Sequence, residues 1–245
     1  MPATIRGNRS VRTAIGVDGC RLGWLTVARN LLTGEFAVAI ADSFRSFLDA
    51  HSGPATSIIV DMPIGLPDAG RRACEAEARQ RIGARRSSVF TPPLRPLLHC
   101  RDYREANQRG KENGRGLSRQ SWGIVPKIRE VDAALSPNMQ STIAEGHPEV
   151  AFTRLGGDRP CRHPKRTREG EAERKAILIA AGLRDIDDAL NDLRRRHPWK
   201  KEFGNDDFYD ACALSLTAEH RFTGTAWRLG GDARDTRGLL MEIWG

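Results

Sequence analysis

The sequence predicts an α/β protein, and three observations carry this prediction. Residues 12–41 contain three β-like runs in quick succession, which is the spacing of an antiparallel meander. Residues 57–61, SIIVD, form a short apolar run of the kind found in a strand buried on both faces. Much of the chain after residue 67 has the apolar spacing of helices, and the longest of them begins near Asn205.

The elements before the buried run are short. The three β-like runs are RTAIGVD, GWLTVARN and EFAVAIA, and the turn-like LLTG joins the last two. Ser43 is a suitable N-cap for the next stretch, FRSFLDAH, in which three apolar residues share one helical face. We therefore expect three strands and one helix before the strand at residues 57–61.

Residues 67–140 predict a helical insertion. Helical patterns occupy three stretches of it, residues 67–83, 103–113 and 120–135. Gly83 is a favourable C-cap for the first, and Pro126 marks a start or a kink in the third. The Pro- and Ser-rich residues 85–98 predict a loop. The insertion would end at a fifth strand with the sequence STIAEG.

The C-terminal part of the chain predicts three more helices. A basic loop is followed by helices over residues 169–181 and 184–196. The last helix is expected to run from Asn205, its N-cap, to about Phe222, and the two acidic residues after Asn205 suit the positive end of a helix dipole. The closing sequence GLLMEIWG suggests one extra strand.

The composition favours a cytoplasmic protein with one domain. We expect a flexible segment over residues 1–12 and a single domain over residues 13–245, large enough to need no disulfide or metal for its core. The N-terminus lacks the apolar stretch of a signal peptide, and no stretch approaches a membrane span, so we expect no membrane partner. The five cysteines are widely spaced without a C-x-x-C pair, which predicts reduced thiols.

The charge favours nucleic acid, DNA or RNA, as a partner. The formal net charge is +8, and neutralising phosphates releases counterions, which favours binding. Four basic clusters lie at residues 79–86, 126–130, 162–168 and 193–201. A solvated helix face or loop is the alternative explanation for each cluster, and it is the better one for the last.

Two predicted strands end in an aspartate, Asp18 and Asp61. Because burying an unpaired charge costs several kcal/mol, Asp18 either caps a turn or faces a metal or a phosphate. If the two strands are parallel neighbours, both aspartates lie at the same edge of the sheet, where α/β folds place their ligands.

The last helix contributes two more carboxylates. Asp207 and Asp210 are three residues apart and share one helical face, although first-turn acids also occur for the helix dipole alone, the better explanation for Asp206. Converging carboxylates repel one another unless hard cations such as Mg²⁺ or Mn²⁺ lie between them. Two such ions, about 3.5–4 Å apart, activate water and stabilise the leaving oxygen of a phosphodiester. The pattern therefore predicts metal-assisted phosphodiester hydrolysis.

The order of these elements resembles the ribonuclease H-like fold, whose mixed five-stranded sheet has the order 3-2-1-4-5. DFYDACA resembles the D-x-x-D-A-x-A start of the last helix in RuvC-type Holliday-junction resolvases. By six ordered motifs, the chain is identified as a member of the bacterial family domain of unknown function 429, described as predicted RNase H-like nucleases. These motifs are GVDGCRLGW, VDMPIGLP, RRSSVF, PKIREVD, HPEVAF and DDFYDA.

The resemblance implies a two-metal nuclease and assigns roles to the acids. Asp18 would bridge both ions from the first strand, and Asp61 and Asp210 would each hold one. Asp207 would bind a metal or orient the attacking water. RuvC-type enzymes work as dimers, so the resemblance also allows a homodimer without fixing the oligomeric state.

Two glutamates near the fifth strand extend this assignment. Glu149 of the HPE motif either joins the site as a catalytic residue or positions His147. Glu145 lies four residues earlier, and the strand period of two cannot be followed through Pro148. Whether Glu145 and Glu149 face the same way is therefore open.

Several residues are candidates for binding substrate phosphates through guanidinium, ammonium or hydroxyl groups. They are Arg85, Arg86, Ser87, Ser88, Lys127, Arg129 and Lys165. For each of them, an ion pair with a neighbouring acid such as Glu130 is an equal alternative. Trp24 and Trp122 could stack on bases, although a place in the core explains an isolated tryptophan better.

Three other functions compete with the nuclease. An actin-like ATPase would need a second copy of the fold, and no G-x-x-x-x-G-K-[ST] loop occurs. A non-catalytic module that binds nucleic acid or protein would gain by losing its four aspartates. A hydrolase of a small phosphate ester or nucleotide would need the same carboxylates, so the sequence does not distinguish it from a nuclease.

Overall fold

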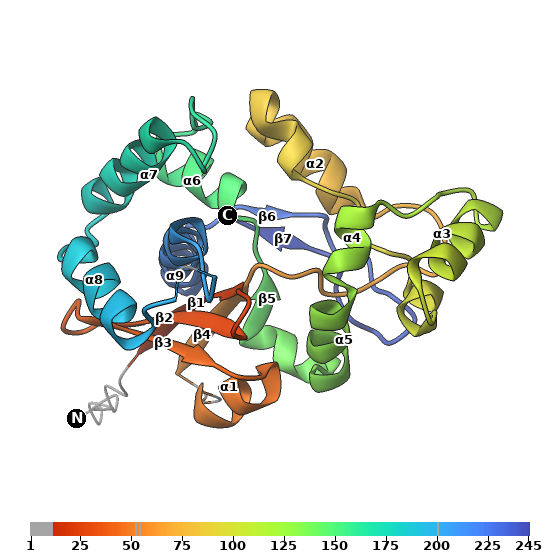
Figure 1. Ribbon diagram of the computed structural model, residues 1–245, viewed down its shortest axis with the longest axis horizontal. Coiled ribbons are helices and arrows are strands. Elements are labelled where there is room, and N and C mark those ends of the chain that lie inside the picture. The colour runs from red at the N-terminus through yellow and green to blue at the C-terminus, as the bar shows by residue number, and fades with distance from the viewer. Residues whose placement is uncertain (1–11, 52, 54, 200) are drawn as a thin grey trace, which may run out of the picture.

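A mixed β-sheet lies at the centre of the protein (Figure 1). The computed structural model describes residues 12–51, 53, 55–199 and 201–245. The strands of the sheet are β1 (Thr13–Gly19), β2 (Trp24–Asn30), β3 (Phe36–Ala41), β4 (Thr56–Val60) and β5 (Ile143–Glu145). Their order is β3-β2-β1-β4-β5, with β1 to β3 antiparallel and β4 and β5 parallel to β1. The predicted α/β class and strand order are therefore confirmed.

Helices cover both faces of the sheet (Figure 1). One face carries α6 (Pro148–Leu155), α7 (Arg168–Ala180), α8 (Ile186–Arg196) and α9 (Asn205–Thr223). The other face carries α1 (Phe44–His51) and α5 (Val125–Ala134). Successive side chains of β1 point to opposite faces of the sheet, so the core has two parts. Ala14 belongs to the cluster around α9, whereas Ile15 and Val17 belong to the cluster around α1 and α5.

The segment between β4 and β5 contains the predicted helical insertion. Its elements are α2 (Ala73–Ile82), η1 (Gly83–Ser88), η2 (Arg95–His99), α3 (Tyr103–Glu112), α4 (Arg119–Gly123), α5 and η3 (Pro137–Ser141). Pro126 lies in the first turn of α5, so it starts a helix rather than kinking one. The stretch predicted as a loop, residues 85–98, holds two short 3₁₀ segments instead.

Two predicted boundaries were wrong, and one helix was not predicted. Helix α2 begins at Ala73 rather than near residue 67, because Arg72 is extended and its guanidinium donates to the carbonyls of Ile64 and Gly65. Asn205 is the first residue of α9 and Gly204 is its N-cap. The α6 helix after the fifth strand was not predicted, although Pro148 at its first turn is a known start signal.

The C-terminal residues form a separate two-stranded sheet. Its strands are β6 (Arg228–Leu229) and β7 (Ile243–Trp244), so only part of GLLMEIWG is a strand. The N-terminal segment predicted to be flexible lies outside the described residues, apart from residue 12. Within the described ranges, no helix combines the length and the hydropathy needed to cross a membrane.

Candidate metal centre

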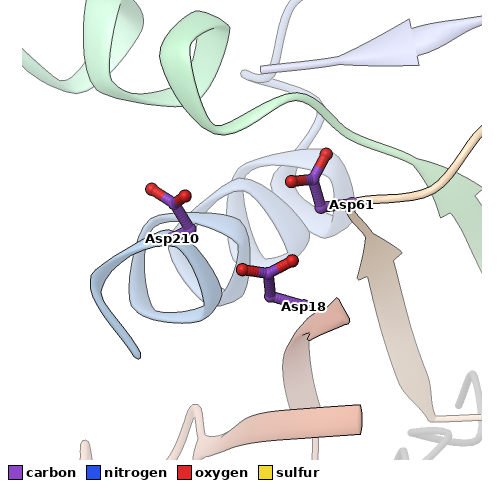
Figure 2. A group of neighbouring side chains, drawn as sticks. All are labelled: Asp18, Asp61 and Asp210. Carbon is purple, nitrogen blue, oxygen red and sulfur yellow. The ribbon is translucent and has the colours of Figure 1, made fainter. Parts of the chain in front are cut away.

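Three aspartates point toward one another at the edge of the sheet (Figure 2). Asp18 comes from β1, Asp61 follows the end of β4, and Asp210 lies near the start of α9. One carboxylate oxygen of each lies within 4.8 Å of those of the other two. Asp18 and Asp210 are buried, with 6% and 1% of their surface exposed. We call Asp18, Asp61 and Asp210 the acidic triad.

The backbone explains why these three side chains meet. Gly16 and Asp18 lie on the face of β1 that α9 covers, and a Cβ at Gly16 would overlap the carbonyl oxygen of Ala211. Because Gly16 has no side chain, α9 packs directly on β1 and brings Asp210 close to Asp18. The amide of Asp61 donates to the carbonyl of Val17 at 2.8 Å, which holds Asp61 beside the end of β1.

Burial and mutual repulsion make the triad a site for a positive charge. Burial, followed by repulsion from Asp61 and Asp210, raises the pKa of Asp18 well above its ordinary value. Burial raises the pKa of Asp61 to about 6. Burial also raises the pKa of Asp210 to about 7, although Lys165 opposes this shift. A cation bound between the carboxylates would stabilise their ionised forms.

The donor atoms of the triad suit Mg²⁺ or Mn²⁺. All three side chains offer carboxylate oxygens, which hard divalent cations prefer. The Oδ1 atom of Asp210 is buried and, among the described residues, has no hydrogen-bond partner. A buried acceptor without a donor is costly, so this oxygen is a natural ligand for a cation. The residues present therefore fit a divalent ion.

Two predicted members of the site are engaged elsewhere. The carboxylate of Asp207 accepts the amide of Gly204 at 2.8 Å and thereby caps α9. The carboxylate of Glu149 pairs with the guanidinium of Arg174, which is also buried. The structure does not bring Asp207 or Glu149 into the acidic triad.

Lys165, predicted to bind substrate, lies directly at the triad. Its Nζ atom is 2.6 Å from Oδ2 of Asp210 and 3.4 Å from Oδ2 of Asp206. Its side chain is 35% exposed, and its ammonium group neutralises part of the charge of the triad. Burial lowers its pKa, but the surrounding carboxylates outweigh burial and keep the pKa above its ordinary value.

Two other basic candidates support the backbone instead. The ammonium group of Lys127 donates to the carbonyl of Gly23 at 2.7 Å, and the guanidinium of Arg129 donates to the carbonyls of Leu98 and Cys100. These contacts fasten the β1–β2 turn and η2. Neither residue forms the alternative ion pair with Glu130, whose carboxylate accepts the indole N–H of Trp24 at 2.9 Å.

The RRSS motif lies in η1 and contacts the loop that carries Lys165. Arg85 donates through Nε to the carbonyl of Cys161 at 2.9 Å, and Ser88 donates to the carbonyl of Arg85. Arg86 and Ser87 are exposed and available to a ligand. Trp24 is fully buried, so it is a core residue rather than a stacking platform.

Sequence reasoning did not assign His147 a place beside the triad. His147 and Asp61 line a small pocket, together with Glu145. The Nδ1 atom of His147 is buried and has no hydrogen-bond partner in the described structure. Burial lowers the pKa of His147, which favours the neutral ring. The HPE motif, which contains His147, is the sequence signal that could have identified this residue.

Glu145 lies outside the triad and is engaged by Arg72. Its two carboxylate oxygens accept hydrogen bonds from Arg72 at 2.7 and 2.8 Å, and both side chains are buried. One of these oxygens also accepts the amide of Ile64 at 2.7 Å. Glu145 therefore fastens the insertion to the sheet, and its role is structural.

We expect Mg²⁺ to stabilise the folded protein more at pH 8 than at pH 5. The pKa values of Asp61 and Asp210 in the folded protein lie above the unfolded value of about 3.9. Stability of the metal-free protein is therefore lost as the pH rises through about 6 and 7, where these carboxyl groups ionise. Bound Mg²⁺ offsets that loss at pH 8, whereas protons compete with it at pH 5.

Thermal unfolding with Mg²⁺ or with EDTA, at both pH values and equal ionic strength, checks this prediction. The rise in Tm caused by Mg²⁺ should be at least about twofold larger at pH 8. An equal rise at both pH values would contradict a carboxylate site with these raised pKa values.

The comparisons with known proteins identify a family. A family model described as Protein of unknown function (DUF429) matches residues 16–235, so the chain belongs to this family. The match spans all three residues of the acidic triad and confirms the family resemblance seen in the motifs. No curated protein and no solved structure matches the chain.

Proposed function

We propose that this DUF429 protein is a divalent-metal-dependent nuclease that hydrolyses phosphodiester bonds. The observation that carries the proposal is the meeting of Asp18, Asp61 and Asp210 at one edge of the sheet, where all three carboxyl groups have raised pKa values and two of them are buried. The family description names no activity, so the proposal depends on the site itself. Mg²⁺ or Mn²⁺ is the proposed cofactor.

The triad would hold the metal ion, and His147 would orient the attacking water. Asp18, Asp61 and the unpartnered Oδ1 of Asp210 would hold the cation. When bound, the ion lowers the pKa of a water and stabilises charge on the phosphate oxygens. The neutral ring of His147, beside Asp61, would accept a hydrogen bond from the attacking water.

Exposed arginines around the site favour a polymer over a small phosphate ester. Arg86 lies in η1, and Arg162 and Arg166 lie in the loop that carries Lys165; all three are exposed. The hydrogen bond between Arg85 and the carbonyl of Cys161 joins η1 to that loop. Such a surface can contact phosphates on both sides of the cleaved bond, which a mononucleotide lacks. The net charge of +8 supports the same choice.

We also propose a cytoplasmic location. All five cysteines are buried free thiols, a state that a reducing compartment maintains. This supports an enzyme that acts on nucleic acid inside the cell.

Cleavage of labelled single-stranded, duplex, hybrid and branched DNA and RNA substrates tests the function. We expect cleavage of at least one of them with Mn²⁺ or Mg²⁺, and none with EDTA. If the protein binds a substrate with equal affinity with and without metal and does not cleave it, the nuclease function is contradicted and a binding module is favoured. If the protein cleaves only a small phosphodiester, the polymer substrate is contradicted but the hydrolysis of phosphodiester bonds is not.

A further inference from the structure

The ion pair between Lys165 and Asp210 brings a fixed cation to the acidic triad. Lys165 lies in the loop between α6 and α7, and two contacts anchor this loop near the site. The carbonyl of Cys161 accepts a hydrogen bond from Arg85, and the guanidinium of Arg166 pairs with Asp206 at 3.1 Å. Lys165 is therefore placed by its neighbours rather than by a long free loop.

The two oxygens of Asp210 are in different situations. Oδ2 is 2.6 Å from the ammonium nitrogen of Lys165, whereas Oδ1 is buried without a partner in the described structure. In a two-ion site, two cations about 3.5–4 Å apart lie among the carboxylates. Here one side of Asp210 already has its cation, and the other side is left for a metal.

Ligands for a second ion are also scarce. One oxygen of Asp207 accepts the amide of Gly204, and one oxygen of Glu149 pairs with Arg174, so each of these carboxylates is already engaged outside the triad. The three triad carboxylates, one ammonium group and one divalent ion would sum to zero charge. A second divalent ion would have to lie beside the ammonium group and would be repelled by it.

We propose that Lys165 takes the place of a second metal ion, so that the site binds one divalent cation. In this arrangement the ammonium group would also contact a phosphate oxygen of the substrate, on the side where a second ion would lie. This inference rests on the proposed function and replaces the two-ion site that the family resemblance implies with one ion and one lysine.

Calorimetric titration of the full chain with MnCl₂ tests the number of ions. We expect one Mn²⁺ per chain for the native protein and two for Lys165→Met, because the methionine leaves Oδ2 of Asp210 without its cation. Lys165→Arg, which keeps the charge, should bind one. Lys175→Met is the matched control, because Lys175 is 33% exposed and pairs with Asp187 away from the triad; it should also bind one.

The outcomes separate this inference from the proposed function. Two ions on the native protein, or one ion on both the native protein and Lys165→Met, would overturn the role of Lys165. Two bound ions on the native protein together with metal-dependent cleavage would contradict the role of Lys165 but support the proposed nuclease activity. One bound ion without cleavage of any substrate would contradict the nuclease activity but agree with a site for one ion. If Lys165→Met does not fold, as judged by circular dichroism, Lys165→Gln replaces it.

Discussion

Replacing Asp18 by asparagine is expected to lower the rate of metal-dependent cleavage by about a hundredfold to a thousandfold. The same substitution is expected to stabilise the metal-free protein. Cleavage falls because the variant loses a carboxylate of the triad. Stability rises because burial, and repulsion from Asp61 and Asp210, raise the pKa of Asp18. A neutral amide of nearly the same shape removes both penalties.

The sign of the pH dependence follows from the same shift. The pKa of Asp18 is higher in the folded protein than in the unfolded chain, so its ionisation costs stability as the pH rises. The asparagine variant avoids that cost. Its advantage in Tm should therefore be largest at pH 8 without metal and should vanish below about pH 4, where the carboxyl is protonated in both states.

Cleavage rates with Mn²⁺ and thermal unfolding with EDTA measure the two effects. Asp49→Asn is the matched control, because Asp49 is exposed and pairs with Arg45 on α1, away from the triad. It should change neither the rate nor the Tm. An Asp18→Asn variant that cleaves at the native rate would show that Asp18 does not take part in the chemistry.

The fold and all three triad residues were predicted from the sequence, Asp18 and Asp61 from strand patterns and Asp210 from helical spacing, although Asp207 was predicted beside it. Alternation and an apolar run place Asp18 and Asp61 at strand ends. The resemblance to the ribonuclease H-like order implied that the two strands are neighbours, and the structure pairs them. The long-range step, the seating of α9 on β1, depends on Gly16, whose importance no local pattern reveals.

Helical spacing could not separate Asp207 from Asp210. Both lie on one face, but the first turn of a helix has unpaired amides, and the carboxylate of Asp207 accepts one of them. Asp210 lies beyond those amides, so its side chain is left for the triad.

The basic residues show a second limit of sequence reasoning. Lys127 and Arg129 look like phosphate ligands because the sequence does not show which carbonyls lie nearby. A long side chain whose ammonium or guanidinium group reaches a distant backbone carbonyl is a tertiary contact. For the same reason Glu149 could not be paired with Arg174, which is 25 residues away.

Replacing Gly16 by alanine is expected to destabilise the protein by about 3 kcal/mol or more. The added methyl group would overlap the carbonyl oxygen of Ala211 and the amide nitrogen of Ser215 in α9. Both are backbone atoms of a buried helix, so no side chain can rotate away, and α9 would have to shift from β1. Urea denaturation measures the loss. Gly123→Ala is the control, because a Cβ there would meet nothing within 4 Å, and its effect should be within about 0.5 kcal/mol.

The same substitution should weaken metal binding, because Asp210 lies on the helix that moves and Asp18 on the strand that does not. At a temperature where Gly16→Ala is still folded, its affinity for Mn²⁺ should fall by at least about tenfold, since ligand positions must hold to within about 0.5 Å. Native stability in this variant would contradict the close packing of α9 on β1. Lower stability with unchanged Mn²⁺ affinity would show instead that the ion does not bind between Asp18 and Asp210. Stability and Mn²⁺ affinity of the Gly16→Ala variant therefore test the packing of the fold and the geometry of the metal site separately, although Gly16 contributes no side chain to either.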